Sequence, residues 1–347
     1  MASNLAARQL EASALATGVL DELAETFALG EVSLHEFLPA GLMNRNWRLQ
    51  TDAGVFALKE FRDASRGDVR RNLAVAADLA RHGLPVPAPC PTSTGNLVAE
   101  AAGSEWCLLP WVAGEHRTGP GLTAGEAREL GRMLGLIHEG LRATEGLPAP
   151  GQPKSKSSTA ADATATLGRF VDLIAVKPAP DEFDKVAAVR LEQRLTLLKR
   201  FADQAPPAPE PDEASGWTHG DFQPLNLLWD GDAIAAVLDW DRVKVQYLAD
   251  EVARAAAVHC ENGAGGLDLD RIAAFAGGYR AEAGVAGAGL TAAADRLWWR
   301  RLCDAWQLAF HYDRDDVSCD HLFLEGEPVL AWWCEHRSEV AKAFTAA

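Results

Sequence analysis

One short loop of this chain carries residue types that suit phosphoryl transfer. The segment His219-Gly220-Asp221-Phe222-Gln223-Pro224-Leu225-Asn226 contains a carboxylate and an amide, and Asp239 follows with a second carboxylate. Phosphoryl transfer requires little covalent chemistry from a protein, but an acceptor oxygen must be held in line and Mg²⁺ must neutralise the phosphate oxygens. A carboxylate can orient an acceptor hydroxyl and accept its proton, and Asn and Asp oxygens are ligands that Mg²⁺ prefers.

The spacing of these residues matches that of a kinase catalytic loop, H-x-D-x-x-x-x-N, through His219, Asp221 and Asn226. Asp239 follows the apolar run 233–238, which predicts a buried strand that fixes the carboxylate in position. Clusters of Asp, Asn and Gly also form ordinary turns, and residues 218–221 alone fit that interpretation. The second Asp after a strand, together with a lysine strand upstream, favours the kinase interpretation.

The upstream half supplies a lysine on a predicted hairpin. Two β-prone runs, 46–49 and 55–59, flank a turn that contains Asp-Ala-Gly. Lys59 ends the second run, as in the V-A-I-K motif whose lysine reaches nucleotide phosphates; a solvated lysine at a strand end is the alternative. The preceding loop has a single glycine, Gly41, and is therefore not G-x-G-x-x-G. The absence of a Walker A sequence disfavours a P-loop fold.

With these motifs together, the chain resembles the aminoglycoside phosphotransferase family, small-molecule kinases of a protein-kinase-like superfamily that also includes choline, homoserine and methylthioribose kinases. The resemblance implies an α+β, bilobal protein-kinase-like fold with a small antiparallel β-sheet N-lobe and a mainly helical C-lobe. Residues 1–110 would form the nucleotide-binding lobe, and residues 111–347 the lobe with the catalytic loop, metal-binding loop and acceptor site. The segments that carry the resemblance are 41–59, 83–87, 108–114, 134–138, 219–226 and 237–241.

The same resemblance implies a role for each site residue. Asp221 would be the catalytic base, and His219 would hold the catalytic loop in shape rather than transfer protons. The cofactors would be ATP and Mg²⁺, with Asn226 and Asp239 as metal ligands. Lys59 would contact the phosphates, while Leu109, Trp111 and Val112 would belong to a hinge strand beside the adenine.

One position departs from the family pattern. A helix after the lysine strand usually carries a Glu that pairs with that lysine, but no Glu lies between Glu60 and Glu100. Asn72 stands near the expected place and could accept a hydrogen bond from Lys59 without the charge. Asp68 or Asp78 could substitute if the helix register differs.

Composition narrows the class of protein. The 347 residues allow two lobes, and 48% hydrophobic content is enough for real cores. No apolar stretch reaches the roughly 20 residues of a membrane span, and residues 1–25 predict a helix rather than a signal peptide. A net charge of −16 disfavours nucleic-acid binding. Acidic surface could attract a cationic acceptor or simply keep the protein soluble.

The six cysteines form no C-x-x-C pair, which argues against a zinc site or a disulfide framework. Buried free thiols and a cytoplasmic location are therefore predicted. The Thr123–Glu126 pair predicts a capping box at the start of the second predicted helix. Helices are expected at 68–82, 122–142, 181–203, 252–259 and 296–312, and loops at 148–165, 205–213, 263–266 and 284–289.

The acceptor is expected to be a small molecule with a hydroxyl group. Protein substrates are disfavoured because no activation segment of the D-F-G to A-P-E type follows Asp239. Aromatic faces beside carboxylates suit a sugar ring or an ammonium group. The hypothetical acceptor pocket comprises some of Trp299, Asp304, Trp306, Asp313 and Asp316.

Several functions and assembly states remain open from the sequence. An antibiotic-resistance enzyme, a metabolic kinase of the homoserine or choline type, a nucleotide-binding pseudokinase and a ligand-sequestering protein all fit some of the features. The pseudokinase hypothesis depends on Asn72 at the place of the expected Glu. The chain could be a monomer or a homodimer.

Overall fold

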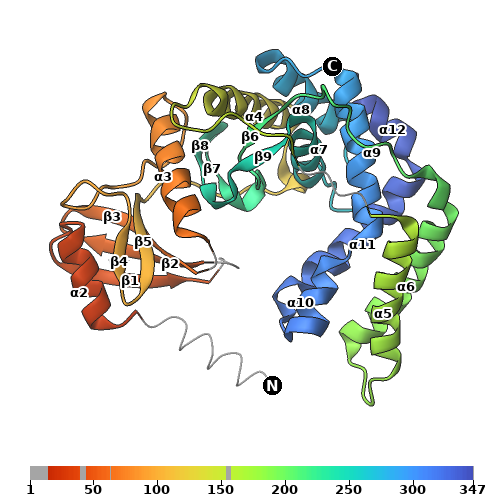
Figure 1. The fold of residues 1–347 in the computed structure, drawn as a ribbon, viewed down its shortest axis with the longest axis horizontal. Helices are drawn as coiled ribbons and strands as arrows, with labels where there is room; N and C mark the ends of the chain where they lie inside the picture. The colour runs from red at the N-terminus through yellow and green to blue at the C-terminus, as the bar shows by residue number, and fades with distance from the viewer. Residues whose placement is uncertain (1–14, 40–43, 63, 154–157, 347) are drawn as a thin grey trace. The chain divides into compact units, whose positions relative to one another are not determined.

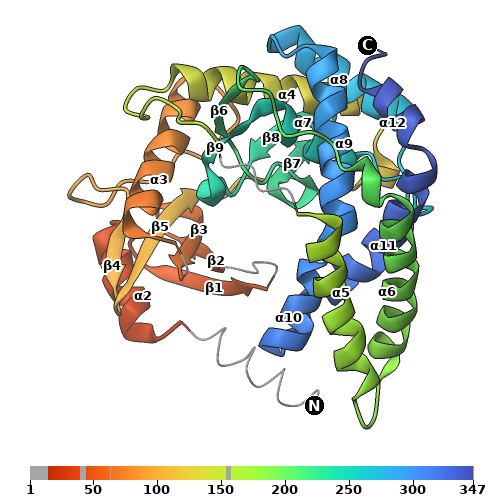
Figure 2. The same ribbon diagram turned by 45° about the vertical axis from the view of Figure 1, so that its right-hand side comes forward.

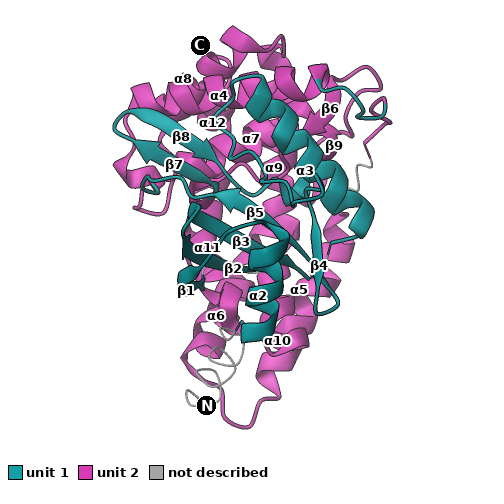
Figure 3. Cartoon of the chain, turned by 90° about the vertical axis from the view of Figure 1, so that its left-hand side faces the viewer, with its two compact units in different colours: residues 1–116, 144–148, 226–243 teal, residues 117–143, 149–225, 244–347 magenta. Residues whose placement is uncertain are grey.

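The computed structural model describes residues 15–39, 44–62, 64–153 and 158–346 of the chain. These residues form two compact units, shown in different colours in Figure 3. Unit 1 comprises residues 1–116, 144–148 and 226–243, and unit 2 comprises residues 117–143, 149–225 and 244–347. The segment 226–243 therefore belongs with the N-terminal part, while the assignment of separate tasks to lobes 1–110 and 111–347 stays a prediction.

Unit 1 is built on a five-stranded antiparallel sheet with the order β1-β2-β3-β5-β4 (Figure 1). The predicted hairpin is confirmed: its two strands pair in register from Arg45 opposite Glu60 to Thr51 opposite Gly54. The strands of this sheet are β1 Val32–Leu38, β2 Arg45–Thr51, β3 Gly54–Phe61, β4 Ala99–Ala101 and β5 Ser104–Pro110.

The sheet buries both faces under helices, as the alternation of side chains along a strand allows. On β5, Trp106 and Leu108 join a core with α2 (Thr17–Thr26), whereas Cys107 and Leu109 pack toward α3 (Arg66–Arg81) on the other face. The predicted helix over 68–82 is thus confirmed. Of the predicted N-terminal helix, the structure describes only residues from 15 onward, which include α2. Residues 1–14, Gly41 and residues 154–157 of the predicted loop 148–165 lie outside the described part.

A second hairpin completes unit 1 and leads to Asp239. Strands β7 (Leu227–Asp230) and β8 (Ala233–Val237) are antiparallel, with Leu227 opposite Val237. The 3₁₀ turn η3 (Pro224–Asn226) precedes this hairpin and η4 (Trp240–Arg242) follows it. The predicted buried strand before Asp239 is therefore confirmed, and its residues Ala236 and Val237 are completely buried.

Unit 2 is mainly helical (Figure 2). It has one two-stranded antiparallel ribbon, β6 (Ser215–Thr218) with β9 (Lys244–Tyr247). The predicted capping box is confirmed, because Thr123 and Glu126 exchange hydrogen bonds at the start of α4. The helices are α4 Ala124–Ala143, α5 Ala160–Ala175, α6 Glu182–Arg200, α7 Leu248–His259, α8 Leu269–Glu282, α9 Gly287–Cys303, α10 Trp306–Arg314, α11 Asp320–Glu335 and α12 Arg337–Ala343, with 3₁₀ turns η1 Gly119–Gly121, η2 Ala202–Gln204 and η5 Val317–Cys319.

Helices α4 and α8 approach so closely that only glycine fits at their crossing. A Cβ atom on Gly131 would stand 1.9 Å from the carbonyl oxygen of Phe275, and one on Gly278 would stand 2.0 Å from that of Arg128. Both positions are inside helices, where glycine costs about 1 kcal/mol relative to alanine. The close backbone contact between the two helices explains why glycine occupies both positions despite this cost.

Several predicted element boundaries are wrong. The helix predicted at 252–259 begins at Leu248, and the one predicted at 181–203 ends at Arg200. The expected helix 296–312 is two helices, because α9 ends at Cys303 and α10 begins at Trp306. Helix α5 begins at Ala160, inside the predicted loop 148–165, with Thr159 as its N-cap. Helix α9 begins at Gly287, inside the predicted loop 284–289. None of the helices in the described ranges is long and apolar enough to cross a membrane.

Candidate active site

Lys59 is the buried cation of unit 1. It follows Leu58 on β3, so the two side chains leave opposite faces of the sheet, and Lys59 is on the face of α3. Its Nζ lies 2.7 Å from Oδ1 of Asp239 and 2.6 Å from Oδ2 of Asp241. Burial acts to lower the pKa of Lys59, but the charges of these two carboxylates outweigh burial and raise it above its usual range.

Asp241 is a partner of Lys59 that the sequence reasoning missed. The side-chain amide of Asn44 donates to its carboxylate, and Nδ2 of Asn72 donates to its backbone carbonyl oxygen at 2.8 Å. Burial raises the pKa of Asp241, although Lys59 acts in the opposite direction. The available signal was the pattern Asp239-Trp240-Asp241, a second acid two residues after the first.

The expected hydrogen bond from Lys59 to Asn72 is not formed, because the side chain of Asn72 binds other groups. Asn72 uses its amide nitrogen on the backbone of Asp241 and its amide oxygen on Nε of Arg71. The other two proposed substitutes are also engaged elsewhere. Asp68 belongs to the N-cap of α3 with Ser65, and Asp78 pairs with Arg81 near the end of that helix.

Asn226 and Asp239 occur together at the open end of the β7–β8 hairpin. The backbone carbonyl of Asn226 accepts a hydrogen bond of 2.8 Å from the N–H of Leu238, the residue before Asp239. Asp239 has left-handed backbone angles, φ 59° and ψ 68°. Such a conformation is uncommon for residues other than glycine and is typical of functional positions that the surrounding structure holds in place.

These two residues fit a magnesium ion in their donor chemistry. They offer an amide and a carboxylate oxygen, and the Asp239 side chain is 38% exposed. Within the described ranges, no group of three or more His, Cys, Asp or Glu side chains could form a self-contained metal site. A site of this kind suits Mg²⁺ held by one or two protein ligands and completed by water and substrate phosphates.

The residues predicted beside the adenine are at the end of β5. Leu109 is partly buried in the strand, and Val112 is half-buried just beyond it. Trp111 is 38% exposed, with the guanidinium of Arg48 5.2 Å from its ring centre. Its backbone N–H donates to the carbonyl of Val55. Contact of these residues with adenine stays a prediction.

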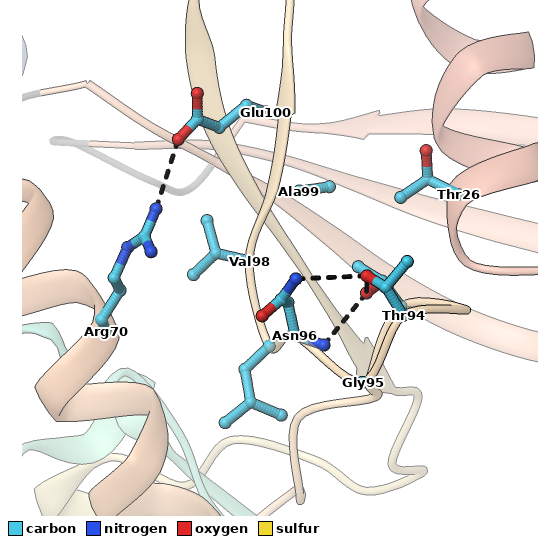
Figure 4. Close-up of a pocket in the computed structure, with 10 residues that line it drawn as sticks. Thr26, Arg70, Thr94, Gly95, Asn96, Val98, Ala99 and Glu100 are labelled. Atoms are coloured by element: carbon cyan, nitrogen blue, oxygen red, sulfur yellow. Dashed lines mark hydrogen bonds and ion pairs between the residues drawn. The ribbon is translucent and has the colours of Figure 1, made fainter.

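A pocket of about 510 Å³ is present in unit 1, but it contains none of the predicted site residues. Figure 4 shows its lining between α3 and the segment before β4. Arg70 pairs with Glu100, and Asn96 donates to Thr94. These polar groups therefore bind one another.

In unit 2, Asp221 has a cationic partner. Nη2 of Arg254 on α7 donates to Oδ1 of Asp221 at 2.6 Å. The backbone N–H of Asp221 donates to Nδ1 of His219, whose ring is completely buried. This geometry agrees with a positioning role for His219, because the ring bonds the loop backbone from inside the core.

Glu251 connects the loop at Gly220 to the helical core and was not identified from the sequence. Its carboxylate accepts hydrogen bonds from the backbone N–H of Gly220 and from Nε2 of His138. The hydroxyl of Tyr279 lies 2.8 Å from Nδ1 of the same histidine. Although burial alone would raise the pKa of Glu251, its hydrogen bonds lower it overall. Glu251 directly precedes the predicted helix 252–259, and its sequence position gives no signal of these partners.

The residues of the hypothetical acceptor pocket have different environments. Trp299 is 2% exposed and its indole N–H donates to the carbonyl of Ser158, while Asp313 pairs with Arg169. Trp306 is 42% exposed and packs edge-to-face on Phe310. Asp304 lies between α9 and α10, and burial raises its pKa. A shared acceptor pocket of these residues stays a prediction.

Comparison with known proteins identifies the family. Residues 35–285 match the model of the phosphotransferase enzyme family. Homoserine kinases from Burkholderia thailandensis and Burkholderia pseudomallei are 30% identical over 112 residues, which make up 32% of this chain and 33% of each relative. The match thus spans about a third of the length of these curated relatives.

Solved structures share the fold. A spectinomycin phosphotransferase in complex with ADP and spectinomycin has a TM-score of 0.67 and 14% identity, covering 94% of this chain and 99% of that chain. An amicoumacin kinase has a TM-score of 0.60 and 18% identity, with 96% of both chains covered. A microcompartment-associated aminopropanol kinase has a TM-score of 0.58 and 18% identity, covering 93% of this chain and 98% of that one. The predicted α+β, protein-kinase-like fold is confirmed.

Proposed function

This chain belongs to the phosphotransferase enzyme family, and we propose that it transfers the γ-phosphoryl group of ATP to a hydroxyl of a small molecule. The observation that carries this proposal is the pairing of buried Lys59 with Asp239, next to the backbone bond that links Asn226 to Leu238. The arrangement gathers a phosphate-binding cation and two Mg²⁺ ligands in one unit of the protein.

Each of these side chains has a distinct task in the proposed reaction. Lys59 binds phosphate oxygens, and Asn226 and Asp239 hold Mg²⁺, which neutralises charge on those oxygens when it is bound. Asp221 orients the acceptor hydroxyl and accepts its proton as the new O–P bond forms and the bond to the leaving ADP breaks. Arg254 fixes the orientation of the Asp221 carboxylate, and Glu251 fixes the loop backbone at Gly220.

The contacts of Lys59 argue for the kinase and against the pseudokinase alternative. It depended on Asn72 in place of an acidic partner for Lys59, but Lys59 has two carboxylate partners without it. Homoserine kinases among the relatives favour a hydroxylated amino compound as acceptor, whereas the drug kinases of similar fold keep an antibiotic in consideration. The six free cysteines support a reducing, cytoplasmic location as part of this proposal.

The test is release of ADP from MgATP across hydroxylated acceptors, repeated with Asp221→Asn. The panel contains aminoglycosides, spectinomycin, macrolides, choline, homoserine and 3-amino-1-propanol. Loss of a general base lowers turnover by about 10²–10⁴-fold, so the variant should be nearly inactive while it still binds MgATP by calorimetry. Asp270→Asn, an exposed change on α8, is the matched control. Wild-type turnover in Asp221→Asn would refute the assignment.

A further inference from the structure

The packing of α7 against α9 places charges in a repeating pattern. Arg296 of α9 donates to Asp250 of α7 through Nε at 3.0 Å and Nη2 at 2.7 Å. One helical turn further along both helices, the corresponding residues are Arg254 and Arg300. One turn after Asp250, α7 therefore has Arg254 instead of an acid that could pair with Arg300. Arg301 is the next residue of α9.

Arg254, Arg300 and Arg301 have fewer hydrogen-bond and ion-pair partners than Arg296. Arg254 has its bond to Asp221, but its Nη1 is buried and has no hydrogen-bond partner. Within the part of the chain that the structure describes, Arg300 forms no hydrogen bond or ion pair. Arg301 approaches only Glu261, at 3.9 Å, which is longer than a hydrogen bond.

Nearby carboxylates compensate the charge of these arginines only in part, Asp250 and Asp304 at Arg300 and Glu261 at Arg301. Arg300 is exposed and the Arg301 side chain is 24% exposed, so both remain in contact with solvent. Partial burial nevertheless lowers the pKa of both residues, and repulsion from Arg254 acts in the same direction. Asp304 and Glu261 contribute negative charge nearby, but neither forms a hydrogen bond with these guanidinium groups within the described ranges. Among these three residues, Nη1 of Arg254 is the buried donor without a partner in the described structure, and an anion would remove its desolvation cost. In a chain of net charge −16, such a cluster is unexpected without a ligand.

We propose that Arg254, Arg300 and Arg301 bind an anionic group of the acceptor, a carboxylate or a phosphate, beside the Asp221 that receives its hydroxyl. This inference rests on the proposed function and specifies the acceptor as a hydroxylated anion or zwitterion. Guanidinium groups match carboxylate and phosphate oxygens with two parallel hydrogen bonds. The assignment differs from the purely cationic acceptor that the acidic composition suggested.

The first experiment measures anion binding without catalysis. Inorganic phosphate is titrated by calorimetry, in the absence of nucleotide, into the wild type, Arg300→Gln, Arg300→Lys and Arg128→Gln. Arg128 is an exposed arginine on α4 and serves as the matched control. We expect Arg300→Gln to weaken phosphate binding by about 10- to 100-fold, with partial recovery in Arg300→Lys. Equal affinity in all four proteins, or no binding to the wild type, would overturn the proposal.

The second experiment distinguishes the acceptor from ATP as the source of the anion. Homoserine is compared with 3-amino-1-propanol, and serine with ethanolamine, because each pair differs only by the carboxylate. We expect Arg300→Gln to raise KM for the carboxylate-bearing member about tenfold more than for its partner. A rise confined to KM of MgATP, or equal effects within each pair, would overturn the acceptor assignment. Turnover that persists in Asp221→Asn would instead refute the proposed function, independently of the phosphate titration.

Discussion

The ammonium group of Lys59 lies 2.7 Å from a carboxylate oxygen of Asp239, a residue 180 positions away in the chain. This contact joins the middle of the five-stranded sheet to the end of the β7–β8 hairpin. Lys59 makes a second ion pair with Asp241, so two carboxylates orient one buried cation. Binding of Mg²⁺ by Asp239 would leave Asp241 as the carboxylate dedicated to Lys59.

Asp241→Asn should therefore weaken nucleotide binding. The amide retains the shape of the side chain but loses its charge, and a hydrogen bond between charged groups contributes about 1.5–3 kcal/mol. We expect KM for MgATP to rise about tenfold, with a smaller change in kcat. Asp232→Asn, exposed in the turn of the same hairpin, is the control. An unchanged KM would show that Asp241 does not position Lys59.

Glu251→Gln should disturb the proposed catalytic loop through its backbone contact at Gly220. A glutamine has one acceptor oxygen for the two donors, Gly220 N–H and His138 Nε2, so one donor loses its partner. We expect stability to fall by about 1–3 kcal/mol, and kcat to fall while KM for MgATP changes little. Urea denaturation and steady-state kinetics measure the two effects, with the exposed Glu192→Gln as control. A normal kcat would contradict the link between this network and Asp221.

His259 should make the fold sensitive to acid. Its ring is buried against Phe222 and Phe275, and neither ring nitrogen has a hydrogen-bond partner in the described structure. Burial lowers the pKa of His259 from 6.5 to about 3. Below pH 6.5 the unfolded chain binds a proton that the folded chain does not, so stability falls as pH decreases toward 3.

His259→Phe removes this titration and keeps an aromatic ring. The slope that His259 contributes is at most about 1.4 kcal/mol per pH unit. Urea denaturation at about pH 7 and about pH 5 should therefore show a smaller loss of stability for the variant than for the wild type. His321→Phe, at an exposed position, is the control. Equal losses in both proteins would mean that the folded state accommodates a charged His259.

Gly278→Ala should separate α4 from α8. The new Cβ would stand 2.0 Å from the carbonyl oxygen of Arg128, and a backbone atom cannot move aside without shifting the helix. Overpacking costs about 1–3 kcal/mol or more, so thermal denaturation should show a clear decrease in Tm. Gly326→Ala on α11 is the matched control, because its Cβ meets nothing within 4 Å. Helix propensity should make that change neutral or stabilising by up to about 1 kcal/mol.

Local sequence patterns were sufficient for much of the fold. Apolar patterns and turn residues predict the hairpin that contains Lys59 and the strand before Asp239. Capping chemistry predicts the Thr123–Glu126 capping box. The break between α9 and α10 does not, because residues 296–312 contain neither Gly nor Pro and remain suited to a helix throughout. Ala160–Ala175 lacks a strong apolar pattern at its start, so its Thr159 cap was not recognised.

The site was predictable only where its residues share a motif. Asp221, Asn226 and Asp239 are recognisable from spacing, whereas Glu251 acquires its role from His138, 113 residues earlier. Asp241 likewise depends on Lys59 and on the side chain of Asn72 in α3. Partners that are distant in sequence are determined by tertiary packing, which single-sequence patterns do not report.

The discontinuous composition of unit 1 has a consequence for how this protein is made. A ribosome completes β3 early, but residues 226–243 emerge only after the unit 2 segments 117–143 and 149–225 have been synthesised. Until then, Lys59 lacks both Asp239 and Asp241, and the nascent sheet would bury a cation without its counter-charges. Unit 1 should therefore reach its final structure late in translation, and an N-terminal fragment that ends before residue 226 should fold poorly by itself.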